Sequence, residues 1–173
     1  MLEDAMTVLQ DVLDIQSRAL LAGDVARLRD TVILPCRQIM TGVEVLVETE
    51  ADFQRGSTAF TGSLHALGVN QFLRLVTEAE FLNDDYIQGH YVTHALRNGA
   101  AMVPSYDNRL VLQRHGDTWR MIEEESSLYA LKWPFDLLRV SATGGLPSPP
   151  QANDVRRTSA TPIALYQAFL DKL

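Results

Sequence analysis

The pattern of apolar and polar positions predicts three helices before residue 69. Residues 2–22 form the first, and Gly23 is placed to end it. A second, shorter helix is expected from a cap at Asp24 to a stop before Pro35, and a third over residues 49–68. The positions that share a helical face are Leu2, Met6, Leu9, Leu13 and Leu20, then Val25, Leu28 and Val32, then Phe53, Phe60, Leu64 and Leu67. Small polar residues crowd the middle of the third helix, so tertiary packing has to hold it.

The pattern changes to that of strands before the third helix and again after it. Residues rich in β-branched and aromatic types occur in five runs, at residues 38–49, 71–82, 86–97, 105–114 and 118–126. Asn83-Asp84-Asp85 is a turn sequence, and the short connections between the last four runs favour antiparallel pairing. Helices followed by a series of strands indicate an α+β fold rather than an alternating βαβ one.

The last hairpin, "RLVLQRHGDTWRMIEEESS" at residues 109–127, can be assigned a register. A two-residue turn at Gly116-Asp117 places Leu112 opposite another apolar residue. A three-residue turn would place Leu112 opposite Arg120 and mix apolar with charged positions, so the first is preferred. The preferred register predicts one apolar face made of Leu110, Leu112, Trp119, Met121 and Glu123.

Two neighbouring glutamates have different positions in this register. Glu123 shares the apolar face, whereas Glu124 lies on the other face, opposite Arg109, with which it would form an ion pair. Desolvation on an apolar wall disfavours a charged carboxylate, so its pKa rises and acid–base chemistry near neutral pH becomes feasible. Glu123 is therefore the main catalytic candidate. The alternative is that Glu123 lies near the open end of the strand and meets water or an arginine.

Three segments carry a family resemblance. They are "AGDVARLRDTVILP" in the helical part, "VEVLVETEADF" where a strand meets the third helix, and "NRLVLQRHGDTWRM", a hairpin with a Gly at its turn and Trp-Arg shortly after it. Over residues 2–127 the chain resembles the NTF2-like superfamily, in its SnoaL-like branch of bacterial proteins. The resemblance implies a cone in which helices close over a curved antiparallel sheet around an apolar cavity, and a homodimer formed through the sheet. Members are isomerases, cyclases or dehydratases acting on apolar ring compounds, or binding and accessory subunits.

The chain is expected to divide into a domain at residues 1–127 and an extension at residues 128–173. Residues 139–161 are dense in Gly, Pro, Ser and Thr, which predicts a linker, and residues 162–173 predict a closing helix. The apolar face of that helix consists of Tyr166, Phe169, Leu170 and Leu173. It would cover its own domain, a dimer partner or the mouth of a pocket.

Composition narrows the classes of function. A share of 46% apolar and 21% charged residues is typical of soluble globular proteins, and no apolar run reaches the roughly 18 residues of a membrane span. A net charge of -7 opposes nucleic-acid binding, which depends on basic residues that neutralise phosphates. The single cysteine, Cys36, allows no intramolecular disulfide, which fits a reducing, cytoplasmic location. Beside Arg37, Cys36 is either a thiol of lowered pKa or, more commonly, a buried inert one.

His90 and His94 would form a metal-binding pair only on a helix. The surrounding "GHYVTHAL" favours a strand, in which residues four apart lie about 13 Å from each other at roughly 3.3 Å per residue. Because the sequence has no metal-binding motif, we expect neither a metal nor another cofactor. Each histidine is a structural residue or a lone base in a pocket.

Three functions remain open, with binding ranked first. In the first, the cone holds an apolar small molecule, and the protein is a binding domain or an accessory subunit. In the second, a cofactor-free lyase or isomerase of the dehydratase kind pairs Glu123 with His90, His94 or Tyr91. In the third, the chain is a structural dimerisation module. The residues expected to contact a ligand are Trp119, Met121, Leu110, Leu112 and Tyr106.

Overall fold

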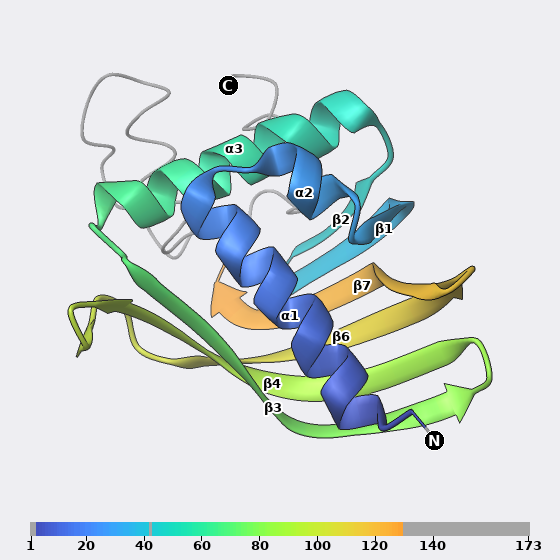
Figure 1. The fold of residues 1–173 in the computed structure, drawn as a ribbon. Coiled ribbons are helices and arrows are strands. Elements are labelled where there is room, and N and C mark those ends of the chain that lie inside the picture. Colours follow the sequence, from blue (N-terminus) through green and yellow to red (C-terminus); the bar gives the residue numbers. More distant parts are fainter. Residues whose placement is uncertain (1–2, 42, 130–173) are drawn as a thin grey trace.

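The computed structural model describes residues 3–41 and 43–129, which form one curved sheet with helices on one of its faces (Figure 1). The helices are α1 (Ala5–Ala22), α2 (Val25–Arg29) and α3 (Glu50–Ala66). The strands are β1 (Val32–Thr41), β2 (Val43–Val47), β3 (Gln71–Asn83), β4 (Tyr86–Arg97), β5 (Ala100–Ala101), β6 (Tyr106–His115) and β7 (Thr118–Tyr129). Their order in the sheet is β2-β1-β7-β6-β4-β3, and β5 pairs with β4. Neighbouring strands are antiparallel except β1 and β7, which run parallel.

The predicted α+β order is confirmed, with local errors at the second helix and at the first strand. The second helix was expected to continue to Pro35, but it ends at Arg29, and Val32 already belongs to β1. The β-branched pair Val32-Ile33 fits a strand, and Val32 pairs with Met121 of β7, so sheet pairing overrides the helical spacing. The strand expected at residues 38–49 is a hairpin of β1 and β2. The predicted linker and closing helix lie outside the described residues.

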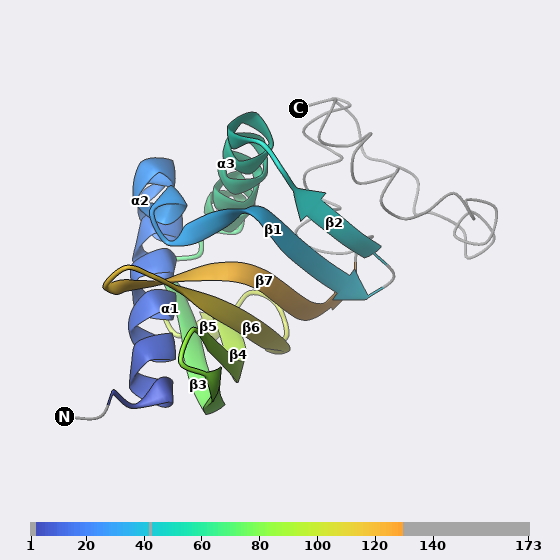
Figure 2. The same ribbon diagram turned by 90° about the vertical axis from the view of Figure 1, so that its right-hand side faces the viewer.

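Helix α1 packs across the inner face of the sheet, over β3 and β4. Asp4 caps its first turn by accepting a hydrogen bond from the Thr7 backbone N–H, and Gly23 ends it in the left-handed conformation, with φ of 69°. The turned view shows α1 and α2 on one side of the strands, with β2 at the far edge (Figure 2). None of the described helices is long and apolar enough to cross a membrane.

Helix α1 packs closely on β4 at Gly89. A Cβ atom added there would lie 2.6 Å from Leu9 Cδ2 of α1 and 2.8 Å from the backbone oxygen of Glu78 on β3. Gly89 is buried, as is Leu9. This position therefore requires glycine for a close approach of helix to sheet.

Helix α1 also bonds directly to the edge strand β3. The side-chain amide of Gln10 donates to the backbone oxygen of Arg74 over 2.7 Å, and its oxygen accepts from the backbone N–H of Val76 over 2.9 Å. One glutamine thus satisfies a donor and an acceptor of the outermost strand.

Candidate functional site

A cavity of about 180 Å³ lies between α3 and the inner face of the sheet. More of its surface is apolar than polar. The apolar lining consists of Leu20, Leu28, Val32, Met40, Val47, Phe53, Ala59, Phe60, Phe72, Met121 and Leu128. The polar lining consists of Gln16, Gln38, Asp52, Ser57, Arg74, Thr93, Tyr106, Asn108, Glu124 and Ser126. All three helices and the strands β1, β2, β3, β4, β6 and β7 therefore contribute side chains to the cavity lining.

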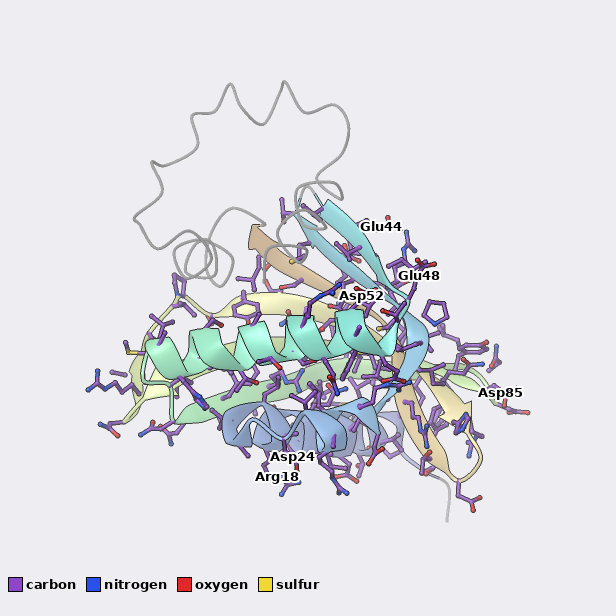
Figure 3. All side chains as sticks on the ribbon, turned by 90° about the horizontal axis from the view of Figure 1, so that it is seen from above. Arg18, Asp24, Glu44, Glu48, Asp52 and Asp85 are labelled. Carbon is purple, nitrogen blue, oxygen red and sulfur yellow. The ribbon has the colours of Figure 1, made fainter. Side chains whose placement is uncertain are left out.

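The cavity exists because α3 presents small residues toward the sheet. Between Phe53 and Phe60, the helix lines the cavity with Gly56, Ser57 and Ala59. Gly56, Ser57 and the neighbouring Thr58 are weak helix formers, so poor helical propensity coincides with room for a ligand. Figure 3 views the helices from above and shows the labelled Asp52 near the N-terminal end of α3, which follows β2 in the chain.

Glu124 is the carboxylate that the sheet contributes to the cavity wall. Its position on β7 is paired with Leu110 of β6 and Gln38 of β1, and its Oε1 accepts a hydrogen bond from the hydroxyl of Tyr91. The Tyr91 side chain is buried, and burial, followed by the negative charge of Glu124, raises the pKa of Tyr91 well above its ordinary value. Tyr91 therefore remains a protonated donor that holds the carboxylate in place.

Arg74 is the cation of the same wall, and it is only 5% exposed. Its Nε donates to Ser17 Oγ over 2.9 Å, and its Nη2 donates to the backbone oxygen of Leu13 and to Gln16 Oε1, each over 3.1 Å. These acceptors all belong to α1. The remaining nitrogen, Nη1, lies 3.9 Å from Glu124 Oε1 and makes no hydrogen bond to the described residues.

A neutral polar group lies beside this charged pair. The side-chain amide of Asn108 donates to Thr93 Oγ1 over 2.7 Å and to the backbone oxygen of Tyr106 over 3.2 Å. Burial, followed by the charge of Glu124, raises the pKa of the Tyr106 hydroxyl. The sheet side of the wall therefore offers neutral hydroxyl and amide groups around the carboxylate of Glu124 and the guanidinium of Arg74, while the second carboxylate of the lining, Asp52, belongs to α3.

No protein-family model and no curated protein matches the sequence. Solved structures do match in fold. An NTF-2 like protein of unknown function from Shewanella oneidensis is 14% identical, with a TM-score of 0.57 over 70% of this chain and 98% of that chain. A ketosteroid isomerase-like protein from Erwinia carotovora is 11% identical, with a TM-score of 0.51 over 73% and 97%. Aln2 from a Streptomyces species is 15% identical, with a TM-score of 0.55 over 70% and 88%. The chain has the NTF2-like fold. Structural similarity at such low sequence identity shows the fold alone, so the function has to be argued from the residues of the site.

In this NTF2-like chain, the predicted register of the last hairpin is right at the turn and wrong beyond it. Leu112 faces Met121 as expected, but Val111 then faces Glu123, which leaves Ile122 as an extra residue on β7. This β-bulge shifts the pairing by one position, and the shift exchanges the faces of all later residues. Glu124, rather than Glu123, consequently faces the cavity.

Glu123 lies on the outer face of the NTF2-like sheet, between two arginines. Its carboxylate accepts hydrogen bonds from Arg37 Nη1 over 3.1 Å and from Arg109 Nη2. Arg109 also bonds to Glu125 over 3.0 Å, so the predicted pair of Arg109 with Glu124 is wrong. The alternative expectation for Glu123, that it reaches an arginine, describes its position.

Among the described residues, the partners of Glu123 are Arg37 and Arg109, and no hydrogen bond or ion pair joins it to another catalytic candidate. His90 and His94 alternate along β4 with buried residues and are themselves half-buried, on the face opposite to the cavity. His90 Nε2 lies 3.8 Å from Glu78 Oε1. Tyr91 points inward to Glu124. Among the residues that the structure describes, no cluster of histidine, cysteine and acidic side chains could hold a metal ion.

The predicted ligand contacts divide into two groups. Met121 and Tyr106 line the cavity, whereas Trp119, Leu110 and Leu112 are buried in the core outside its lining. The Trp119 ring lies under the guanidinium of Arg114 at 4.4 Å.

Cys36 is the buried, inert thiol of the two alternatives. It is 1% exposed, and burial, followed by the charge of Glu124, raises its pKa to about 12. The neighbouring Arg37 does not lower it, because that guanidinium bonds to Glu44 and Glu123 instead.

Proposed function

We propose that this NTF2-like chain binds one small, mainly apolar molecule in the cavity between α3 and the sheet. An apolar cavity of about 150 Å³ holds one benzene molecule. The cavity here, at about 180 Å³, fits a single ring with a substituent.

The observation that carries the proposal is that every residue of α3 between Phe53 and Phe60 that lines the cavity is small. A domain that served only as a structural module would gain stability by filling this space, because interiors are normally close-packed. Instead, Gly56, Ser57 and Ala59 leave it open next to a buried, charged side chain. Apolar walls with a few convergent polar groups are characteristic of ligand pockets.

Filling the cavity from α3 is expected to abolish binding. Ser57 lines the cavity, so Ser57→Leu places a large side chain in it. The neighbouring Thr58 is exposed, so Thr58→Leu is the matched control. Toluene and phenol are titrated while the methyl resonances of Met40 and Met121 are followed by NMR. We expect shifts that saturate in the wild type and in Thr58→Leu, and affinity weaker by at least about tenfold in Ser57→Leu. Equal affinity in all three proteins would rule out this cavity as the binding site.

We propose association of two copies through the outer face of the sheet as a second role. The part of that face formed by β3 and β4 favours it. Leu73 and Leu75 are 43% and 49% exposed there, and they pair across the strands with His94 and Val92. Exposed leucines side by side on a sheet mark an association surface. We propose that a second copy covers them.

Light scattering after gel filtration tests this association. We expect the wild type to have the mass of a dimer and Leu75→Glu the mass of a monomer, because a charge would be buried without a partner. Leu82→Glu is the control, since Leu82 is 51% exposed but lies at the far end of β3. A monomeric wild type at micromolar concentration would exclude the proposal.

A further inference from the structure

Arg74 and Glu124 face each other in the cavity wall without forming a hydrogen bond. The distance from Arg74 Nη1 to Glu124 Oε1 is 3.9 Å, whereas charge-assisted N–H···O bonds are about 2.7–2.9 Å long. Opposite charges in a buried site attract each other strongly. Something must therefore hold the two groups apart.

Both side chains are fixed from behind by other elements. Arg74 is held by Ser17, Leu13 and Gln16 of α1, which take its Nε and Nη2 donors. Glu124 is held by the hydroxyl of Tyr91. Closing the gap would break these bonds, so the separation is built into the fold.

The gap has unused hydrogen-bonding capacity on both sides. An arginine Nη carries two N–H donors, and a carboxylate has about four acceptor positions. Arg74 Nη1 makes no hydrogen bond, and Glu124 accepts only the one from Tyr91, among the residues that the structure describes. Both residues line the cavity.

Only certain chemical groups fit between them. Two partners 3.9 Å apart can both bond to one oxygen atom, provided that it accepts from Arg74 and donates to Glu124. A hydroxyl does both. An ether or a ketone only accepts and would turn a lone pair toward the carboxylate, an ammonium only donates, and a carboxylate on the ligand would be repelled by Glu124.

We propose that the molecule bound in the cavity is a neutral alcohol or phenol, whose hydroxyl oxygen bridges Arg74 Nη1 and Glu124 while its apolar body lies against α3. This inference rests on the proposed binding function and adds the class of ligand. The hydroxyl oxygen makes the same two hydrogen bonds that a water molecule at this position would make, so replacing such a molecule costs no hydrogen bond.

Phenol and toluene test the inference, because they share a ring and differ by a hydroxyl in place of a methyl group. We expect the wild type to bind phenol more tightly than toluene by about tenfold, since the hydroxyl bonds to two charged groups. In Glu124→Gln, Tyr91 takes the amide oxygen and the amide nitrogen faces the cavity, so phenol affinity falls by at least about fivefold and toluene affinity is unchanged. Glu123→Gln is the matched control one residue away, on the outer face, and it should leave both affinities as in the wild type.

The outcomes separate this inference from the binding function. If toluene binds as tightly as phenol and Glu124→Gln changes neither affinity, the cavity binds small molecules but the hydroxyl bridge is wrong. If neither probe binds the wild type, the binding function itself fails. Benzoate on the wild type gives a check that needs no variant, because benzoate affinity above that of phenol would overturn the choice of a neutral ligand.

Discussion

Replacing Gly89 by alanine is expected to lower the free energy of unfolding by about 3 kcal/mol. The new methyl group would lie 2.6 Å from Leu9 Cδ2, 2.8 Å from the Glu78 backbone oxygen and 2.9 Å from Ala79 Cβ. The Glu78 contact is with the backbone of a paired strand, so α1 and β3 must both shift to relieve the overlap. Urea denaturation followed by far-UV circular dichroism measures the change.

Gly62→Ala provides the opposite expectation in the same protein. No atom lies within 4 Å of a Cβ added at Gly62, which is exposed within α3. Alanine there should stabilise the protein by about 0.5–1 kcal/mol through its better helical propensity. A Gly89→Ala protein as stable as Gly62→Ala would mean that α1 does not pack on β4 at this position.

Replacing Arg74 by alanine is expected to lower the free energy of unfolding by about 3–5 kcal/mol. The buried guanidinium bonds to three groups of α1, and its removal leaves Gln16 Oε1 without its donor and Glu124 without a nearby cation. Arg18 of α1 is exposed, so Arg18→Ala should change stability by less than about 0.5 kcal/mol. The same urea denaturation measures both variants.

A double variant separates the charge from the packing in this result. Arg74→Met combined with Glu124→Leu leaves no buried charge alone, so it should recover part of the stability that Arg74→Ala loses. A loss below about 1 kcal/mol in Arg74→Ala would show that the bonds between α1 and β3 contribute little.

Periodicity in the sequence was sufficient for most of the fold. The apolar stripe and Gly23 place α1 well, and α3 begins at its predicted Thr49 cap. The predicted strands at residues 71–82 and 86–97 correspond to β3 and β4. They could be predicted because the alternation of residue types is visible within each strand, whatever strand it pairs with. The predicted end of the second helix was wrong because Val32 pairs with Met121 of the distant strand β7, and local periodicity does not show such a pairing.

Which side chains face the cavity could not be predicted from the local sequence pattern alone. The two-residue turn at Gly116 was correct, yet a bulge at Ile122 reversed which glutamate faces inward. Nothing in the alternation of the "MIEEE" run distinguishes a bulge from a regular strand.

Arg74 did leave a signal in the sequence. It occupies the inward position between Phe72 and Val76, where a charged residue interrupts an apolar series. A charge at such a position is buried and must have partners, so the alternation of residue types is enough to mark it as a site candidate.

The two hydrogen bonds of Gln10 also affect how copies of this protein can meet. An edge strand normally exposes N–H and C=O groups to which a strand of another chain can add. At Arg74 and Val76 those groups are already bonded to the Gln10 side chain, and α1 lies beside them. A second chain cannot extend the sheet there, so the protein is protected from edge-to-edge aggregation at the middle of β3, while the leucines on the outer face of the same strand stay free for a face-to-face contact.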